Sequence, residues 1–516
     1  MTEGNGNSIS SDRFGALRRY VPLLVWAIVI GTLLFIPLRI IKYGYLPSDD
    51  ALRHAAKAVS GKSWSEILVL NPVYQIDHEF GWNLLLEKIY HWTDWSTDQL
   101  VVFSVVILFL VVGWSALPWF RRPEAWLIAL LTAHLTTLLD ARFMLGRPYL
   151  VSFAATAAIL LMWQKHGASP PKKWMLALAT TIFALAVFVH GVWYLWVLLL
   201  GAFVFAGQIR WAISLGICWI VGVFIGSALT AHPFAYPIQA IKLALLATGM
   251  HETARTMATE LQPSSGDLFA LIAFGALMVL RQLAKLNAIP LTRNPAFWLA
   301  AFCWVLAFRV GRFWGDWGWP ALLVLIAWDL QMFLESRFAE NCFKRLAFTA
   351  AIAIATFFSI TADTDSRWTY NLYKDYLEEK NPDLKGWMPD KGGIFYTADM
   401  FLFYDTFFKN PHGDWRYMLG FEPTWMPKED FEVFHTIIWN SNAVKGYAPW
   451  VAKMKPADRL AIQGSRGSPP EIPQLEWNYG VSGIWIGRLP RPVENETVPP
   501  TVPAKTNSVA EKNSAH

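Results

Sequence analysis

Two adjacent carboxylates, Asp49 and Asp50, stand in the stretch YLPSDDALRHAAKAV, which follows directly on the first long apolar run of the chain. One acidic and three potentially cationic side chains then repeat at positions i, i+3, i+4 and i+7, which is one face of a helix. They are Asp50, Arg53, His54 and Lys57. At a membrane–water boundary, such a carboxylate can accept a proton from a hydroxyl nucleophile, and the cations can hold a leaving phosphate. The stretch therefore indicates transfer of a group from a phosphate-activated lipid.

The same stretch allows two other interpretations. Ser48 is a good N-cap residue, and acids in a first turn complement the helix dipole, so the polar stripe could be a solvated face of a helix that ends at Gly61. Asp49 and Asp50 could instead hold a divalent cation, Mg²⁺ or Mn²⁺, through oxygen ligands. The acidic pair permits such a cofactor without requiring one.

The composition predicts a polytopic membrane protein. The chain of 516 residues is 54% hydrophobic and 16% charged, with a mean hydropathy of +0.31, whereas soluble proteins carry about 25% charged residues. It has 28 Trp, a residue that gathers at membrane interfaces. Lys and Arg are scattered, which argues against nucleic acid as a partner. The three Cys form neither a disulfide framework nor a metal-binding spacing.

Eleven segments are read as membrane spans, since a span needs about 20 mostly apolar residues. They lie near 20–41, 100–120, 125–139, 148–163, 174–190, 192–207, 211–230, 268–281, 296–309, 320–335 and 346–361. The expected fold is an all-α membrane domain of about eleven helices over residues 20–361, preceded by a cytoplasmic N-terminus at 1–19.

The density of Lys and Arg in the loops predicts that the N-terminus lies in the cytoplasm. We expect the chain in the inner, or cytoplasmic, membrane. Two long loops, 42–99 and 231–267, then face outward, and YPIQAIKLALLATGM in the second of them is read as an interfacial helix. Residues 362–490 also face outward as a small α/β domain, and 491–516 form a disordered tail. In this domain GIFYTADMFLFYDTFF and VSGIWIGRL are predicted strands and YNLYKDYLEE a predicted helix.

Two further outer segments carry charge. ARFMLGRPY holds Arg142 and Arg147, which could grip a phosphate or extend to lipid head groups. GRFWGDWGWP packs Arg312 and Asp316 among three Trp, an arrangement suited to sugar stacking, or to an interfacial aromatic belt with a turn. Arg309 is a second phosphate candidate.

Histidines add to the candidates. His190 ends an apolar segment on the outer side, where an ionisable group is either functional or structural. His78 and Glu79 could join the outer cleft or begin a solvated helix. Three more candidates follow the interfacial helix: His251, Glu252 and Arg255.

The order of these features resembles the GT-C superfamily of membrane glycosyltransferases. A cytoplasmic N-terminus, a first span and an acidic pair opening a large outer loop match its architecture, and a C-terminal outer α/β domain is common in it. Within residues 46–92, DDALRHAAKAVSGKSW is similar to the family's acidic motif and juxtamembrane helix, and HEFGWNLLLEKIY resembles its second amphipathic helix.

The resemblance implies an inverting enzyme that moves a sugar from a polyprenyl-phosphate carrier to a lipid, glycan or protein acceptor at the outer face. An acid of the first-loop motif is the base or acceptor-orienting residue in that superfamily, and only Asp49 and Asp50 match the motif here. The alternatives are a transporter or flippase of a lipid-linked saccharide, transfer of a phospho-substituent or a whole glycan, and a non-catalytic envelope scaffold. No sequence repeat supports a transporter, and ionisable residues gather at the outer rim.

Overall fold

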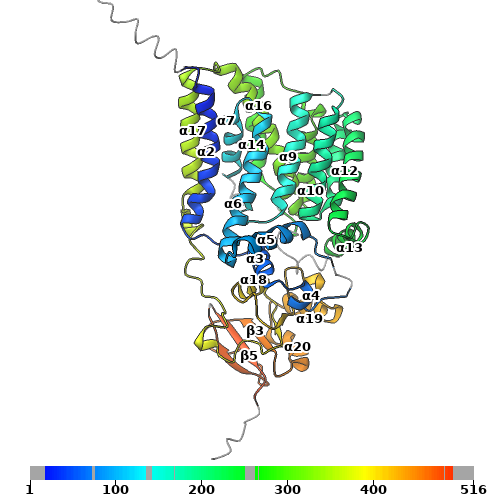
Figure 1. Cartoon of the computed structure of the whole chain (residues 1–516), viewed down its shortest axis with the longest axis vertical. Helices are drawn as coiled ribbons and strands as arrows, with labels where there is room; N and C mark the ends of the chain where they lie inside the picture. The colour runs from blue at the N-terminus through cyan, green and yellow to red at the C-terminus, as the bar shows by residue number, and fades with distance from the viewer. Residues whose placement is uncertain are drawn as a thin grey trace, which may run out of the picture.

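The computed structural model describes residues 18–72, 76–134, 142–167, 169–249, 262–264, 266–481 and 483–491. Each of the eleven predicted spans contains a helix, although the predicted segment 125–139 runs beyond the described end of α7. These helices are α2 (Val21–Lys42), α6 (Thr97–Ser115), α7 (Pro123–His134), α9 (Tyr149–His166), α10 (Lys173–His190), α11 (Trp196–Phe205), α12 (Ile209–Leu229), α14 (Leu268–Leu283), α15 (Pro295–Ala307), α16 (Trp319–Arg337) and α17 (Phe343–Thr361). Together they form one bundle (Figure 1).

Six helical segments of the described chain are long and apolar enough to cross a membrane: Val21–Lys42, Thr97–Trp119, Lys173–His190, Ile209–Leu229, Trp314–Arg337 and Phe343–Thr361. Three more apolar helices are shorter: Trp193–Phe205, Leu268–Leu283 and Pro295–Ala307. The structure thus supports a helical membrane protein, while eleven spans stay a prediction.

The bundle has two unlike ends. The start of α2 lies at one end and the C-terminal domain at the other (Figure 1). At the end away from that domain, the guanidinium of Arg345 in α17 bonds both oxygens of Glu124 in α7, at 2.6 and 3.0 Å. Both side chains are buried, so this pair fixes the far end of the bundle.

The first long loop folds into α3 (Asp50–Ser60), α4 (Trp64–Ile67) and α5 (Phe80–Thr93). Gly61, with a φ of 64°, ends α3 as predicted. The cap, however, is Asp49, whose carboxylate accepts from the Asp50 amide, and not Ser48. The solvated-face interpretation is also wrong, because Asp50, Arg53 and His54 are buried.

In the second loop, α13 (Ala235–Gly249) forms where an interfacial helix was expected. The predictions for the N-terminal residues 1–17 and for the tail from 492 onward concern residues outside those described, as do the predictions for His251, Glu252 and Arg255. The described short 3₁₀ segments are η1 (Leu117–Trp119), η2 (Trp193–Leu195), η5 (Leu291–Arg293), η7 (Thr364–Ser366), η8 (Pro382–Leu384), η9 (Pro423–Trp425) and η10 (Val444–Tyr447).

The C-terminal domain is a five-stranded mixed sheet in the order β2-β1-β3-β5-β4. Its strands are β1 (Ile394–Tyr396), β2 (Arg416–Tyr417), β3 (Arg459–Gln463), β4 (Glu476–Tyr479) and β5 (Ile484–Arg488), and its helices are α18 (Met400–Lys409), α19 (Lys428–Trp439) and α20 (Ala448–Lys453). Strand β1 is parallel to β2 and β3, and β5 is antiparallel to β3 and β4.

Two secondary-structure predictions in this domain are wrong. The segment 393–408 is a strand only at its start, because Asp399 caps α18 by accepting from the Phe401 amide and turns the rest into a helix. The segment 370–379 is turn and loop instead of helix. Tertiary contacts hold it there: the Asn371 amide donates to the Leu46 carbonyl at 2.8 Å, and Lys374 pairs with Asp405 at 2.5 Å.

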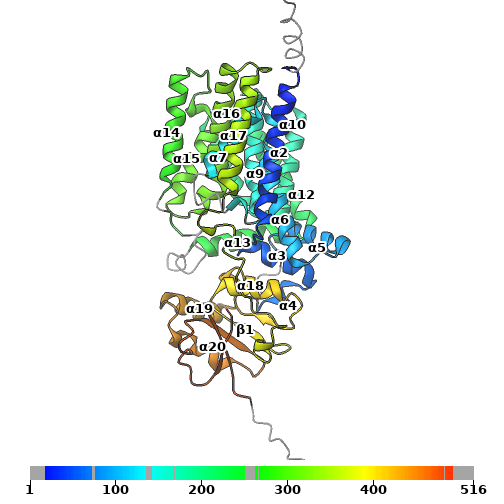
Figure 2. The same ribbon diagram turned by 90° about the vertical axis from the view of Figure 1, so that its left-hand side faces the viewer.

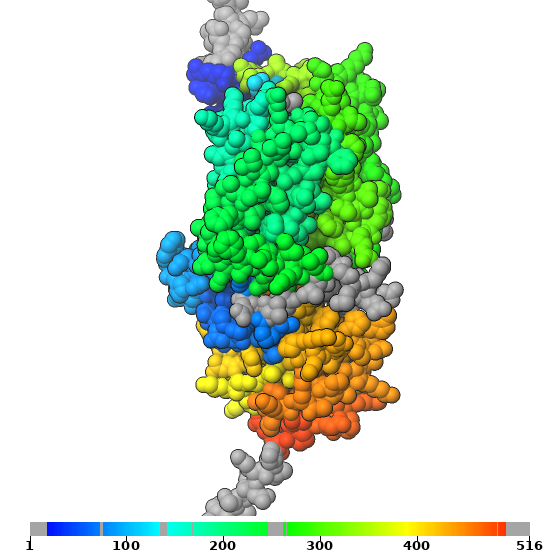
Figure 3. Space-filling view, turned by 90° about the vertical axis from the view of Figure 1, so that its right-hand side faces the viewer, coloured from blue at the N-terminus to red at the C-terminus, as the bar shows by residue number. Residues whose placement is uncertain are grey.

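The first loop and the C-terminal domain form one structure. Leu68 pairs with Tyr417 as a parallel bridge at the edge of the sheet, and the Val69 amide donates to the Tyr417 carbonyl at 2.9 Å. Helix α18 packs on α3 (Figure 2). In the space-filling view the blue first loop lies between the green helices and the yellow and orange domain on the left side of the seam (Figure 3). The seam is therefore built from residues far apart in the chain.

Close packing of α10 and α12 depends on glycine. A Cβ at Gly226 would lie 2.6 Å from the Ala184 carbonyl oxygen and 3.0 Å from the Val187 Cβ. Gly226→Ala is therefore expected to lower the free energy of unfolding in detergent by about 1–3 kcal/mol. Gly275→Ala in α14 is the matched control, since nothing lies within 4 Å of its Cβ position. Equal thermal unfolding of both variants would contradict this packing.

Candidate functional site

The acidic pair lies at the junction of the helical bundle and the C-terminal domain. One oxygen of Asp50 accepts from Arg53 Nε at 2.7 Å, and the other accepts from Arg147 Nε at 2.7 Å. Arg147 Nε is also 3.3 Å from Asp49 Oδ1. The side chain of Asp49 is 22% exposed and that of Asp50 is 9% exposed. Asp49 is thus the carboxylate that a substrate can reach more easily.

A second buried carboxylate completes this acidic cluster. Glu79, at the start of α5, accepts from Arg53 and lies 3.2 Å from His54 Nε2. His78 Nε2 is 3.8 Å from the same Glu79 oxygen. Arg53 therefore bridges α3 to the start of α5 through two carboxylates, which is the arrangement that makes a buried guanidinium tolerable.

Both bridging carboxylates are ionised despite their burial. Burial opposes ionisation of Asp50, but Arg147 and Arg53 outweigh it and lower its pKa below the ordinary value. Burial acts in the same direction on Glu79, where Arg53 and then His54 and His78 lower the pKa well below the ordinary value. Burial lowers the pKa of His78, so this imidazole is neutral at pH 7.

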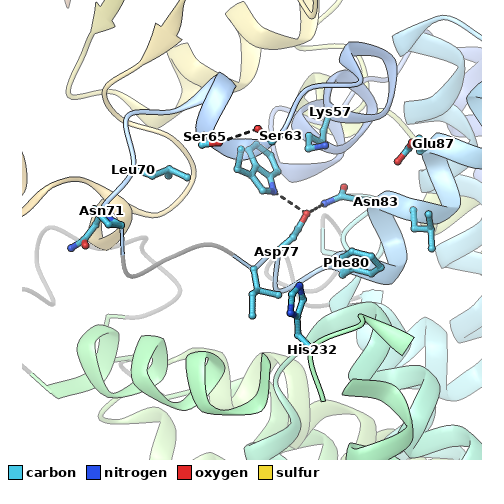
Figure 4. Close-up of a pocket in the computed structure, with 14 residues that line it drawn as sticks. Lys57, Ser63, Ser65, Leu70, Asn71, Asp77, Phe80, Asn83, Glu87 and His232 are labelled. Carbon is cyan, nitrogen blue, oxygen red and sulfur yellow. Dashed lines mark hydrogen bonds between the residues drawn. The ribbon is translucent and has the colours of Figure 1, made fainter. Parts of the chain in front are cut away.

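Asp77 positions His54 through a chain of hydrogen bonds. Asp77 Oδ2 accepts from Trp64 Nε1 at 2.8 Å and from Asn83 Nδ2 at 2.5 Å, and Asn83 Oδ1 is 2.6 Å from His54 Nδ1. Figure 4 shows Asp77 directed at Asn83 beside a cavity of about 590 Å³, with His232 across from them. The network thus fixes the His54 ring beside Glu79, on the same face of α3 as Asp50 and Arg53.

The C-terminal domain closes the acidic cluster. The Arg53 guanidinium carbon lies 3.9 Å from the ring centre of Phe421, a cation–π contact. Tyr404 of α18 is buried nearby. Burial, with the Asp50 and Asp49 carboxylates, raises the pKa of Tyr404 well above its ordinary value, so the phenol keeps its proton.

A cationic cluster surrounds Asp316. It brings together four predicted site residues: Arg142, His190, Arg312 and Asp316. Arg142 and Arg312 both pair with the Asp316 carboxylate, Arg312 through its Nε at 2.8 Å. Arg312 also lies 3.4 Å from His190 Nε2, and His190 Nδ1 lies 3.0 Å from the Ser152 hydroxyl. Arg142 and Arg147, from one short segment, thus reach two different clusters.

A π-helical turn, η6 (Trp314–Gly318), presents Asp316. Such turns often occur at functional sites. Asp267 holds the turn by accepting from Trp314 Nε1 at 2.8 Å and from Trp319 Nε1 at 3.2 Å. Gly318 is required, since a Cβ there would lie 2.2 Å from the Trp314 ring. The turn is buried rather than part of an exposed aromatic belt.

An amphipathic cavity of about 410 Å³ adjoins this cationic cluster. Arg312, His190 and His78 form its polar end, and α13 supplies apolar lining through residues such as Leu243 and Ala244. The C-terminal domain contributes Glu422, Thr424 and Trp425. A cavity with a charged residue at one end and an apolar lining along α13 matches a lipid phosphate, which joins an anionic group to a long apolar chain.

Most predicted site residues therefore come together, with one exception. Arg309 is exposed and belongs to neither cluster, although it is only three residues from Arg312. Within the described residues, no group of three or more His, Cys, Asp or Glu is arranged to hold a metal ion. A cation on Asp49 and Asp50 would have to displace Arg147, so the donor set does not fit a resident metal.

Sequence reasoning missed Asp77, Asn83, Tyr404 and Phe421. Glu79 was expected either in the outer cleft or at a solvated helix start, and its burial against Arg53 places it in the cleft. Asp77 directly precedes the quoted motif HEFGWNLLLEKIY, and Glu79 is its second residue, so the two carboxylates that flank His78 were the available signal. Nothing local marks Phe421, whose partner Arg53 is distant in the chain.

Comparison with known proteins assigns no family. No family model matches the sequence, and no curated protein matches it. The fold and site define a class, a multi-helix membrane protein with an ion-paired site beneath a C-terminal α/β domain.

The Arg147–Asp50 pair has a pH signature. A carboxyl with a lowered pKa stabilises the fold above its ordinary pKa, about 3.9, and this contribution is lost as the pH falls further. Arg147→Met is expected to raise the pKa of Asp50, because burial and the remaining Glu79 charge favour the neutral form. The variant should therefore lose less stability than wild type between about pH 5 and pH 3.

The check is the thermal unfolding midpoint of the purified protein across this pH range. Arg39→Met is the matched control, because Arg39 is exposed near the end of α2. Identical pH slopes for wild type and both variants would refute the assigned pairing.

Proposed function

We propose that this protein is a GT-C-type membrane glycosyltransferase that moves a sugar from a polyprenyl-phosphate donor to a glycan, lipid or protein acceptor at the outer face of the membrane. The observation that carries the proposal is the neighbourhood of two unlike sites. An acidic pair and an amphipathic cavity lined by the Arg312 guanidinium meet at one junction, and His78 and Glu79 connect them. Transfer from a lipid phosphate to a hydroxyl needs both parts.

The donor lies in the amphipathic cavity. Its phosphate meets Arg312 and His190, and its polyprenyl chain follows the apolar side of α13. Arginine suits this role, because its fork of donors matches phosphate oxygens. Asp316 keeps the guanidinium of Arg312 oriented.

The acceptor hydroxyl lies at Asp49. As the bond between the anomeric carbon and the phosphate oxygen breaks, the acceptor oxygen bonds the opposite face of that carbon and its proton passes to the carboxylate. The polyprenyl phosphate leaves with the bonding electrons, and the configuration inverts. Nearby carboxylates stabilise the positive charge that develops in the oxocarbenium-like transition state. Asp50, with a lowered pKa and two guanidinium partners, is a weak base that positions Arg147.

Asp49→Asn is expected to lower kcat by about 10²–10⁴-fold, the contribution of a positioned proton acceptor. Asp50→Asn is expected to lower kcat as well, because Arg147 and Arg53 lose their shared carboxylate. Membranes containing each variant would be assayed for glycan transfer, with acceptors compared by mass spectrometry against a deletion strain.

Asp94→Asn is the control for these substitutions. Asp94 is exposed and has a φ of 53°, which Asn also adopts readily. Loss of a fixed sugar mass identifies the donor sugar, whereas loss of a phospho-substituent or a whole glycan selects the alternative transfer reactions. Wild-type transfer by both site variants at equal protein level would reject the catalytic role.

Arg312 and Arg309 provide a matched pair for the donor site. Arg312→Gln is expected to raise KM for the polyprenyl-phosphate donor about tenfold or more, since a hydrogen bond to a charged group is lost. Arg309→Gln should leave this KM unchanged, because Arg309 is exposed outside both clusters. Steady-state kinetics with purified donor measure both values. A larger effect at Arg309 would place the phosphate elsewhere.

A further inference from the structure

The C-terminal domain has a cavity of its own, of about 600 Å³, that the transfer site does not use. It lies where β1 and β3 end. Thr397, Ala398 and Asp399 follow β1 directly, and Ala461, Ile462 and Gln463 are the last residues of β3. Because β1 and β3 are parallel neighbours, their carboxyl ends open on the same edge of the sheet.

This edge is a topological switch point. From β1 the chain runs through α18 to β2, on the side away from β3. From β3 it runs to β4 and β5, on the side away from β1. The two departing connections leave a crevice between them, and open α/β sheets bind their ligands in such crevices. The sheet topology and the measured cavity therefore point independently to the same place.

The lining selects the kind of ligand. Lys374 is the single cation among the lining residues, and Asp405 holds it at 2.5 Å. With Asp399, the lining has two carboxyl groups for that one cation, which disfavours phosphate and other anions. Apolar side chains such as Leu402 and Ile484 line part of the cavity. Hydroxyl and amide groups line much of the remainder: Ser48, Tyr370, Asn371, Thr397, Asn442, Tyr447 and Gln463.

Two aromatic rings stand at the cavity with large exposed areas. Tyr370 is 54% exposed and Phe401 is 53% exposed. Exposed rings beside hydroxyl and amide groups bind the apolar faces of sugar rings while the polar groups take the sugar hydroxyls. Ser48, which lines the cavity and bonds Tyr370 at 3.1 Å, immediately precedes Asp49. One edge of the cavity is therefore adjacent in the chain to the acidic pair.

We infer that this cavity is a binding site for an uncharged oligosaccharide. Resting on the proposed function, the oligosaccharide is the part of the acceptor glycan beyond the sugar that reacts at Asp49. The domain then selects acceptors by binding a neutral part of the glycan that is distant from the reacting hydroxyl.

The test uses purified full-length protein in detergent and saturation-transfer NMR. The probes are uncharged oligosaccharides of hexoses, deoxyhexoses and N-acetylhexosamines, together with phosphorylated forms of the same sugars. Phe401→Ala and Gln463→Ala are expected to weaken binding of the neutral probe about fivefold or more each. Tyr373→Ala is the matched control, because Tyr373 is 91% exposed and does not line the cavity.

The outcomes separate this inference from the proposed reaction. Asp49→Asn should lower kcat and keep oligosaccharide binding, whereas Phe401→Ala should raise KM for the acceptor and leave kcat nearly unchanged. Absence of neutral-sugar binding, binding of phosphorylated forms alone, or binding insensitive to both cavity variants would overturn the inference even if transfer by Asp49 is established.

Discussion

The architecture depends on one buried cation, the guanidinium of Arg53. It lies in the first loop, 2% exposed, between the carboxylates of Asp50 and Glu79 and against the ring of Phe421. Removing any one carboxylate would leave an uncompensated buried charge, which costs about 3–5 kcal/mol in such pairs. The start of α3, the start of α5 and the C-terminal domain therefore all contact the Arg53 side chain.

Two separate networks of ion pairs lie at the junction, one around the acidic pair and one around Asp316. Arg147 joins the acidic pair, and Arg142, five residues earlier, joins Asp316, whose other partner Arg312 lines the amphipathic cavity. One short segment thus sets the distance between the proposed proton acceptor and the proposed phosphate site. The π-helical turn at 314–318 holds the second network through bonds from two Trp to Asp267. Neither network needs a metal ion for its geometry.

Hydropathy was enough to locate the helices, and spacing was enough to place Asp50, Arg53 and His54 on one face of α3. Burial of that face was not predictable, because Glu79 and Phe421 approach it only in the folded chain. The aromatic run after β1 was read as a strand, yet the local signal for a helix was there in Asp399, a capping residue. Arg309 and Arg312 look alike in the sequence, and only packing separates them.

The bridge between Leu68 and Tyr417 has a consequence for biosynthesis. Arg53 and Leu68 are made early, whereas Tyr404, Tyr417 and Phe421 are made only after the last helix of the bundle. A nascent chain with all its bundle helices in place still lacks one wall of the acidic cluster. Since domains fold as their residues emerge, the order of synthesis itself withholds a complete site until the C-terminal domain has folded against the first loop.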